Sequence, residues 1–82
     1  MDWIVYILRC ADNSLYTGIT RDINRRLKEH NEDNRLAAAY TRARRPVSLV
    51  YQESHHDRSS ATKREAIIKK MSKIEKEILI KQ

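Results

Sequence analysis

The sequence predicts an α+β fold in which a small three-stranded antiparallel sheet is flanked by helices. The order of elements is strand, strand, helix, strand, helix, helix. Two short runs rich in β-branched and aromatic residues come first, separated by the turn-forming pair Asp12-Asn13. Helix-capping residues and apolar residues at helical spacing dominate the chain after residue 20. With 82 residues, one glycine and one proline, we expect a single domain, 1–82, of regular elements with short connections.

The first two elements are predicted to form a hairpin. Trp3–Arg9 is a strand by composition, and its apolar residues do not alternate with polar ones. This pattern is typical of a central strand that is covered on both faces. Leu15–Ile19 is the second arm and contains Gly18, the only glycine. A glycine inside a strand predicts either a bend or the close approach of another group to the main chain.

The first helix is predicted over about Ile23–Asn31, with Thr20 or Asp22 as its cap. Arg26 and His30 lie four residues apart, and so share one flank of this helix. Taken singly, each has a plain structural interpretation. Arg26 fits a solvated helix face, and His30 fits a surface histidine near a helix end.

The middle of the chain is predicted to be mostly loop. Ala37–Ala39 can add a helical turn, and Tyr40–Arg45 is a basic loop that stops at Pro46. Val47–Gln52 is the third strand by composition.

Two helices complete the predicted fold. Asp57 or Ser59 begins a long helix that extends to about Met71. Ser72 and Glu75 then have the spacing of a capping box, which predicts a fresh helix running towards the end of the chain.

Charge is distributed unevenly along the chain and favours a polyanionic partner. The net charge is +6, with a balance of −1 over residues 1–34 and +7 over residues 35–82. No apolar stretch approaches the ~20 residues of a transmembrane helix, so we expect no membrane attachment. Cys10 is the only cysteine, which excludes an internal disulfide and predicts a buried thiol in a cytosolic (cytoplasmic) protein.

Tyr6 and Tyr16 lie on the two predicted strands of the hairpin and are candidates for chemistry. Core packing with a bonded hydroxyl is the default interpretation of such tyrosines. A phenol with an ordinary pKa near ~10 can activate water only beside a cation or a positive cluster. Arg26 is the candidate cation, and its guanidinium also suits a phosphate oxygen.

Glu65 lies beside the core-facing stripe of its predicted helix. A carboxylate in that place needs a partner, because an unpaired buried charge is costly. We weight a salt bridge with Lys69, one turn further on, at roughly two to one over a metal ligand. A single carboxylate can still hold Mg²⁺ when water and substrate phosphate supply the other ligands.

The segment Tyr40–Arg45 interleaves an aromatic residue with three arginines. Its candidates for nucleic-acid contact are Tyr40, Arg42, Arg44 and Arg45. Such a segment suits phosphate contacts combined with stacking on a base or sugar. A solvated basic loop is the competing interpretation, and we weight the two about evenly.

Taken in order, these residues resemble the GIY-YIG nuclease superfamily, specifically its small stand-alone bacterial members. The resemblance covers nearly the whole chain and rests on order and spacing. It is carried by Ile4-Val5-Tyr6, Tyr16-Thr17-Gly18, Arg26, His30, Glu65, Tyr40–Val47 and Ala66–Glu77. The chain departs from the pattern at Ile4, where the first motif has glycine, and at Ala37–Ala39, where relatives tend to have glycine-containing sequence.

The resemblance implies a role for each residue of the pattern. Tyr6 would be the general base or would orient the attacking water, with Tyr16 hydrogen-bonded beside it. Arg26 would stabilise charge on the phosphoryl oxygens, and His30 would assist proton transfer or hold the substrate. Glu65 would bind one divalent cation, Mg²⁺ or alternatively Mn²⁺. The implied products are a 5′ phosphate and a 3′ hydroxyl.

Two hypotheses about function follow from the residues and the resemblance. The first is a metal-dependent DNA endonuclease that selects nicked, branched or single-stranded structure in DNA repair or recombination, with a targeting protein as a further partner. A lone small domain has little surface for reading a long base sequence, since specific modules bury at least ~600 Å² on DNA. The alternative is a nucleic-acid-binding module that has the nuclease fold but little or no turnover.

Overall fold

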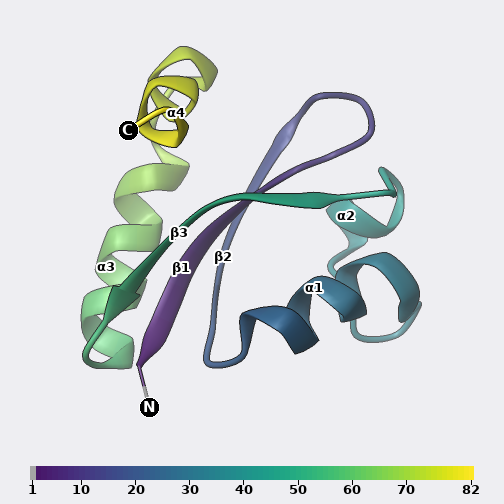
Figure 1. The fold of residues 1–82 in the computed structure, drawn as a ribbon, viewed down its shortest axis with the longest axis horizontal. Coiled ribbons are helices and arrows are strands. Elements are labelled where there is room, and N and C mark those ends of the chain that lie inside the picture. The colour runs from purple at the N-terminus through teal and green to yellow at the C-terminus, as the bar shows by residue number, and fades with distance from the viewer. Residues whose placement is uncertain (1) are drawn as a thin grey trace.

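The computed structural model describes residues 2–82 and confirms the α+β class. Its elements are β1 (Trp3–Arg9), β2 (Leu15–Thr20), α1 (Ile23–Glu32), α2 (Ala39–Arg42), β3 (Ser48–His55), α3 (Arg58–Lys69) and α4 (Lys73–Ile80). The three strands form one antiparallel sheet in the order β2-β1-β3, so the first strand is central, as its composition predicts (Figure 1).

Both faces of β1 are covered, which explains why its apolar residues do not alternate with polar ones. Val5 and Ile7 face a cluster completed by residues of α3 and α4, among them Ile68. Tyr6 and Leu8 face the other way, and residues of α1 pack against that second cluster. Figure 1 shows α3 and α1 on opposite sides of the sheet. Burying each such aliphatic side chain stabilises the fold by about 1.5–3 kcal/mol.

The segment predicted as a basic loop contains an additional helix. Ala39–Arg42 forms the single turn α2, so Tyr40 and Arg42 lie on a helical turn. Tertiary packing accounts for the difference, because Ala37 and Thr41 are buried in this region. The small alanine side chains allow the segment to pack closely.

The third strand is longer than its apolar residues predict. It continues to His55, because Glu53 and His55 pair with Val5 and Trp3 of β1. The carboxylate of Glu53 accepts hydrogen bonds from His55 and from Arg64 of α3. These partners let polar residues continue a ladder that the sequence pattern predicts to end at Gln52.

The helix starts are set by the predicted capping residues. Asp22 accepts a hydrogen bond from the backbone of Arg25 at 3.0 Å, and Asp57 accepts one from the backbone of Ser60 at 2.8 Å. Ser72 begins α4 with both bonds of the predicted capping box present. Each cap contributes about 1 kcal/mol to the stability of its helix.

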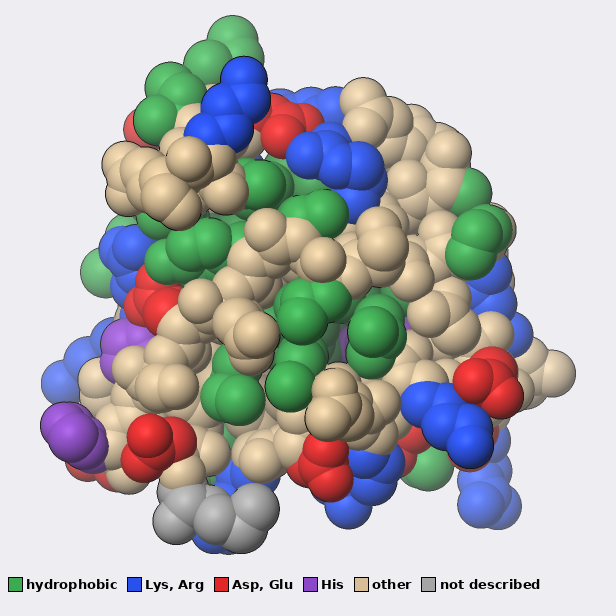
Figure 2. Space-filling view, in the orientation of Figure 1, with side chains coloured by type: hydrophobic (Ala, Val, Ile, Leu, Met, Phe, Trp, Pro, Cys, Tyr) green, Lys and Arg blue, Asp and Glu red, His purple; other side chains and the backbone are tan. Residues whose placement is uncertain are grey.

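Charged side chains of both signs are interspersed around the rim of the face shown in Figure 2, and hydrophobic side chains gather in its middle. The excess positive charge therefore does not form one unbroken surface in this view. Within residues 2–82, no helix combines the length and apolar character needed to cross a membrane.

Candidate functional site

Tyr6 lies directly across the sheet from Gly18, and the glycine makes room for it. A Cβ atom at Gly18 would lie 2.5 Å from the hydroxyl oxygen of Tyr6 and 2.7 Å from its Cζ. Gly18 does not adopt a positive φ. Of the two predicted reasons for a glycine here, the structure therefore supports the close approach of another group.

The Tyr6 hydroxyl starts a buried chain of hydrogen bonds. Its oxygen lies 2.8 Å from Nε2 of His30, and Nδ1 of His30 lies 2.7 Å from the Thr41 hydroxyl. The Thr41 hydroxyl donates its own proton to the carbonyl of Ala38 at 3.1 Å. Since that proton is used, Thr41 accepts from His30, which places the imidazole proton on Nδ1. Nε2 is then the acceptor for the Tyr6 hydroxyl.

Electrostatics agree with a neutral imidazole at His30. Burial lowers its pKa to about 4, and the charges of Arg26 and Arg45 act in the same direction while Glu29 opposes them. The side chain has no solvent exposure. The interpretation of His30 as a surface histidine is therefore wrong, because α2 covers the end of the helix that carries it.

Tyr6 is also neutral. Burial raises the pKa of its phenol to about 12, Arg26 lowers it, and Tyr16 and Glu65 raise it further. A hydroxyl that donates to a neutral imidazole is oriented and is not ionised in the free protein.

Tyr16 joins the buried chain to the basic segment. Its ring centroid lies 5.2 Å from that of His30 and 5.9 Å from that of Tyr40, on which it stacks. The resemblance implies a hydrogen bond between Tyr16 and Tyr6, but the Tyr6 hydroxyl bonds His30, and the two tyrosine rings lie 6.5 Å apart. Tyr16 is thus an aromatic neighbour of the hydrogen-bonded row Tyr6–His30–Thr41 and is not part of it.

Arg26 is partly buried and lies close to the Tyr6 phenol and the His30 imidazole. Its Nη1 donates to Glu29 at 2.9 Å and to the carbonyl of Leu36 at 2.8 Å. Its charge acts on the pKa values of Tyr6 and His30. This location excludes the fully solvated helix face as its environment.

Glu65 forms the salt bridge that its spacing predicts. Its carboxylate lies 3.4 Å from Nζ of Lys69 and is only 18% exposed. Its negative charge raises the pKa of Tyr6, so the carboxylate lies near enough to act on the tyrosine although it belongs to α3. Structure and sequence therefore agree on the ion pair, and the structure adds the proximity to Tyr6.

The donor set near Tyr6 fits a cation held mainly by its substrate. No three His, Cys, Asp or Glu side chains converge within residues 2–82, and Glu65 is the carboxylate whose charge acts on Tyr6. Mg²⁺ is commonly held by one or two carboxylates together with waters and substrate phosphates. Lys69 is 54% exposed and can move aside when a cation replaces it.

Arg45 connects the basic segment to the carboxyl end of α1. It donates to the carbonyls of His30 and Asp33 at 2.8 and 3.0 Å, and to the side chain of Asn34 at 2.8 Å. A cation at a helix carboxyl end binds the carbonyls that have no partner in the helix. Arg45 therefore helps to hold the backbone of His30 in place. Contact between Arg45 and nucleic acid stays a prediction.

Arg42 and Arg44 have weaker ties to the protein. Arg42 donates to the carbonyl of Asn34 at 2.7 Å. The Arg44 guanidinium lies 3.9 Å from the ring centroid of Tyr40 and donates to Asp12 at 3.1 Å. Tyr40, 37% exposed, therefore lies between Tyr16 and an arginine. Their contact with nucleic acid likewise stays a prediction.

Thr41 is the residue of this arrangement that sequence reasoning missed. It is fully buried and holds the tautomer of His30. In the sequence it sits among arginines, eleven positions after His30, and no periodicity links the two. Only the packing of α2 against α1 identifies it.

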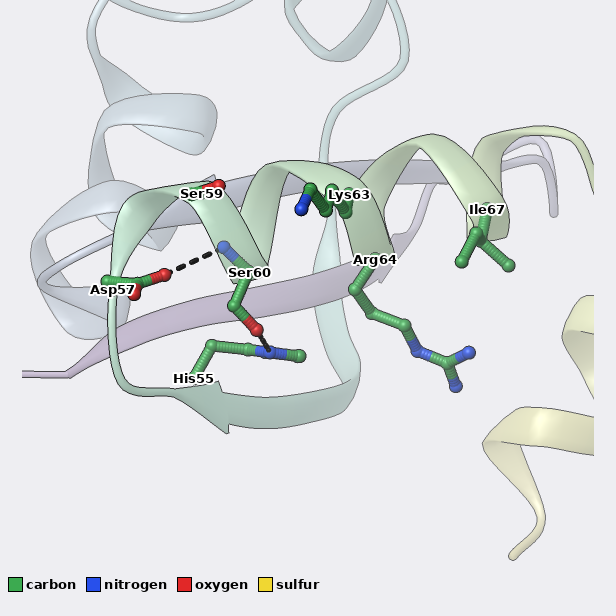
Figure 3. A pocket seen from close by; sticks show the side chains of 7 residues that line it. All are labelled: His55, Asp57, Ser59, Ser60, Lys63, Arg64 and Ile67. Atoms are coloured by element: carbon green, nitrogen blue, oxygen red, sulfur yellow. Dashed lines mark hydrogen bonds between the residues drawn. The ribbon is translucent and has the colours of Figure 1, made fainter.

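A groove of about 400 Å³ lies elsewhere, between the end of β3 and α3 (Figure 3). It is lined by His55, Asp57, Ser59, Ser60, Lys63, Arg64 and Ile67. Figure 3 shows the imidazole of His55 bonded to the hydroxyl of Ser60 and Asp57 capping the helix. None of the candidate site residues lines this groove.

Substituting Gly18 tests the close approach of Tyr6. Gly18→Ala is expected to lower the free energy of unfolding by about 1–3 kcal/mol, because the new methyl group would force the tyrosine ring to move. Urea denaturation measures this cost. The Tyr6→Phe variant lacks the hydroxyl oxygen that lies closest to the added methyl group. In that variant, Gly18→Ala should therefore lower the free energy of unfolding by less. Equal costs in both backgrounds would show that the hydroxyl is not the obstacle.

Comparison with known proteins gives one consistent family. The family model described as GIY-YIG catalytic domain matches residues 2–77. A UPF0213 protein of Desulfotalea psychrophila is 56% identical over 79 residues, which are 96% of this chain and 71% of that protein. A UPF0213 protein of Syntrophus aciditrophicus is 55% identical over 78 residues, which are 95% of this chain and 88% of that protein.

Two solution NMR structures share the fold. The UPF0213 protein from Bacillus halodurans is 40% identical, with a TM-score of 0.62. A protein from E. faecalis is 38% identical, with a TM-score of 0.68. Each comparison covers 99% of this chain and 84% of the other.

Proposed function

The chain belongs to the GIY-YIG family, and from that premise we propose that it is a metal-dependent endonuclease that hydrolyses phosphodiester bonds in DNA. The observation that carries the proposal is the buried hydrogen-bonded chain from Tyr6 through His30 to Thr41. A guanidinium from Arg26 and a carboxylate from Glu65 lie near enough to act on the Tyr6 phenol. In this proposal the combination supplies a proton acceptor, a phosphate ligand and a cation ligand.

Tyr6 and His30 act together in the proposed reaction. The attacking water gives a proton to the Tyr6 oxygen, while the Tyr6 proton passes to Nε2 of His30. The resulting imidazolium keeps both N–H groups bonded, one to Tyr6 and one to Thr41. Burial and the nearby arginines oppose that imidazolium in the free protein, and the bound phosphate supplies the negative charge that offsets them.

Arg26 binds the phosphoryl oxygens in this proposal. Its hydrogen bonds to Glu29 and to the carbonyl of Leu36 both use Nη1, and its side chain also acts on the Tyr6 hydroxyl, which places the guanidinium beside the proposed reaction. A guanidinium edge suits two phosphate oxygens and stabilises charge that develops on them.

Glu65 would hold a divalent cation, Mg²⁺ or Mn²⁺, in place of its ion pair with Lys69. A cation there would neutralise charge on the phosphoryl group and on the leaving 3′ oxygen. The remaining ligands would come from water and from the substrate. The leaving 3′ oxygen takes a proton from solvent water, so the products of the proposed reaction are a 5′ phosphate and a 3′ hydroxyl.

The substrate in this proposal is nicked, branched or single-stranded DNA in repair or recombination, with a targeting protein as a further partner. Tyr40 is 37% exposed, stacks on Tyr16 and has the Arg44 guanidinium over its ring. A base or sugar that stacks on Tyr40 would take the place of Arg44, which would then contact phosphate.

One observation favours the alternative of a binding module with little turnover. The pKa of Tyr6 is raised to about 12 and that of His30 is lowered to about 4, so the free protein has neither a ready base nor a ready acid. Under this alternative the same residues bind a phosphate without activating water.

A cleavage panel separates the two functions. Labelled flap, nicked, branched and single-stranded DNAs are incubated with Mg²⁺, with Mn²⁺ and with chelator. We expect metal-dependent cuts that Glu65→Ala abolishes while nearly sparing binding. Glu32→Ala is the matched control, because Glu32 is an exposed glutamate at the carboxyl end of α1. This variant should cleave as the wild type does.

Each outcome of the panel has a defined meaning. Cleavage by Glu65→Ala at the wild-type rate would remove Glu65 from the site. Binding of every DNA without cuts in any metal would favour the binding module and contradict the proposed enzyme.

A further inference from the structure

Three separate segments meet around Trp3, the only tryptophan of the chain. The start of β1, the turn from β2 into α1 and the first turn of α3 all lie at the same end of the fold (Figure 1). The guanidinium carbon of Arg21 lies 5.7 Å from the Trp3 ring centroid, and that of Arg58 lies 5.6 Å from it. Two cations thus lie over one half-buried aromatic ring.

Within residues 2–82, no hydrogen bond or ion pair is made by the guanidinium group of Arg21 or of Arg58, and both side chains are exposed. The neighbouring carboxylates of Asp22 and Asp57 are directed to the backbone amides that they cap. An exposed cation–π contact is worth only about 0.5–1 kcal/mol, so bringing two like charges to one ring favours an anion between or beside them.

Trp3 and Arg58 lie on the same elements, β1 and α3, as residues of the candidate site. Arg58 and Glu65 are seven residues apart on α3, which puts them on one helix face about 10 Å apart. Trp3 precedes Tyr6 by three residues of β1, about 10 Å along the strand, and its side chain packs on the α3 face of the sheet, whereas that of Tyr6 packs on the α1 face. That distance corresponds to about three steps of duplex DNA at 3.4 Å each, or to fewer nucleotides of a stretched single strand.

We propose that Trp3, Arg21 and Arg58 form a second nucleic-acid contact, which binds an unpaired segment next to the cleaved bond. The two arginines bind successive phosphates, and the exposed part of the Trp3 ring stacks on an unpaired base. The inference rests on the proposed function, because the unpaired segment is taken to be part of the same substrate. It would account for the proposed preference for branched or single-stranded DNA, since a base inside a continuous duplex has both faces stacked on its neighbours.

Tryptophan fluorescence tests the contact directly, because Trp3 is the only emitter of its kind. The full chain is titrated with a labelled single-stranded oligodeoxynucleotide in chelator, so that cleavage does not occur. Trp3 emission and oligonucleotide anisotropy are followed together. We expect saturable quenching with the same Kd that the anisotropy reports.

The double variant Arg21→Ala/Arg58→Ala should weaken that Kd at least tenfold and reduce the salt slope of binding by about 1.4, which is two phosphates at about 0.7 each. Lys70→Ala/Lys81→Ala is the charge-matched control, since both lysines are exposed and lie towards the opposite end of the fold (Figure 1). It should change the Kd much less. A circular dichroism spectrum and a denaturation curve show that each variant is folded.

The outcomes distinguish this inference from the proposed function. Binding without quenching, or a double variant with the Kd and salt slope of the wild type, would overturn the contact while metal-dependent cleavage stood. Quenching without any cleavage would keep the contact and reject the enzyme. A duplex of the same sequence that quenches as strongly as the single strand would overturn the stacking. A titration with single-stranded RNA of the same sequence shows whether binding and quenching depend on the deoxyribose.

Discussion

Tyr6→Phe is expected to reduce metal-dependent DNA cleavage by roughly 10²- to 10⁴-fold, the usual contribution of a positioned acid or base. The variant keeps the ring that packs over Gly18 and loses only the hydroxyl that faces His30. Single-turnover cleavage of the best substrate at saturating enzyme isolates this step from binding. The unfolding free energy should fall by about 1–3 kcal/mol, because Nε2 of His30 is left buried without a partner.

Tyr51→Phe is the matched control for this substitution. The Tyr51 hydroxyl is bonded to Glu53 on β3, away from the buried chain at His30. This variant should cleave at the wild-type rate. If Tyr6→Phe also cleaves at that rate, the Tyr6 hydroxyl does not take part in the chemical step.

Acid is expected to destabilise the protein through His30. Burial lowers its pKa to about 4, below the ordinary value of 6.5, so between these pH values the unfolded chain binds a proton that the folded chain does not. Protons therefore favour the unfolded state in this window. The free energy of unfolding should fall by about 2–3 kcal/mol between pH 7 and pH 4.5 from this group. Urea denaturation across that range measures it.

His30→Gln isolates the contribution of the histidine. The pKa values of some carboxyls, such as those of Glu53 and Glu77, are lowered by their partners. Their protonation also lowers the free energy of unfolding as the pH falls, but it does so equally in the wild type and in the variant. The difference between the two pH profiles therefore reports His30 alone, and the variant should show the flatter curve above pH 4.5. Parallel profiles would contradict a neutral, buried His30.

The elements with local signals were predictable. The continuous apolar run of β1, the caps at Asp22 and Asp57 and the capping box at Ser72 each act within a few residues of chain. For the same reason the helical spacing of Glu65 and Lys69 predicts their ion pair. The third strand is predicted from composition alone, and the prediction ends it too early. The residues that pair with Glu53 from β1 and α3 cannot be identified from the sequence.

The candidate site was only partly predictable. Its residue types and their order are visible in the sequence, and the shared flank of Arg26 and His30 follows from helix geometry. The burial of His30 was not visible, because it depends on the turn α2, whose residues read as a basic loop. The positioning role of Arg45 was hidden for the same reason.

By itself, the sequence determined the class of the fold, the starts of its helices and the family pattern of chemistry-bearing residues. Local backbone preferences, caps and periodicity act over a few residues, so they can be read along the chain. The tertiary structure decided the environment of each group: the neutral tautomer held by Thr41, the proximity of Glu65 to Tyr6, and the two arginines over Trp3. These depend on burial and on distances between residues far apart in the sequence, which only the packing of helices against both faces of the sheet establishes.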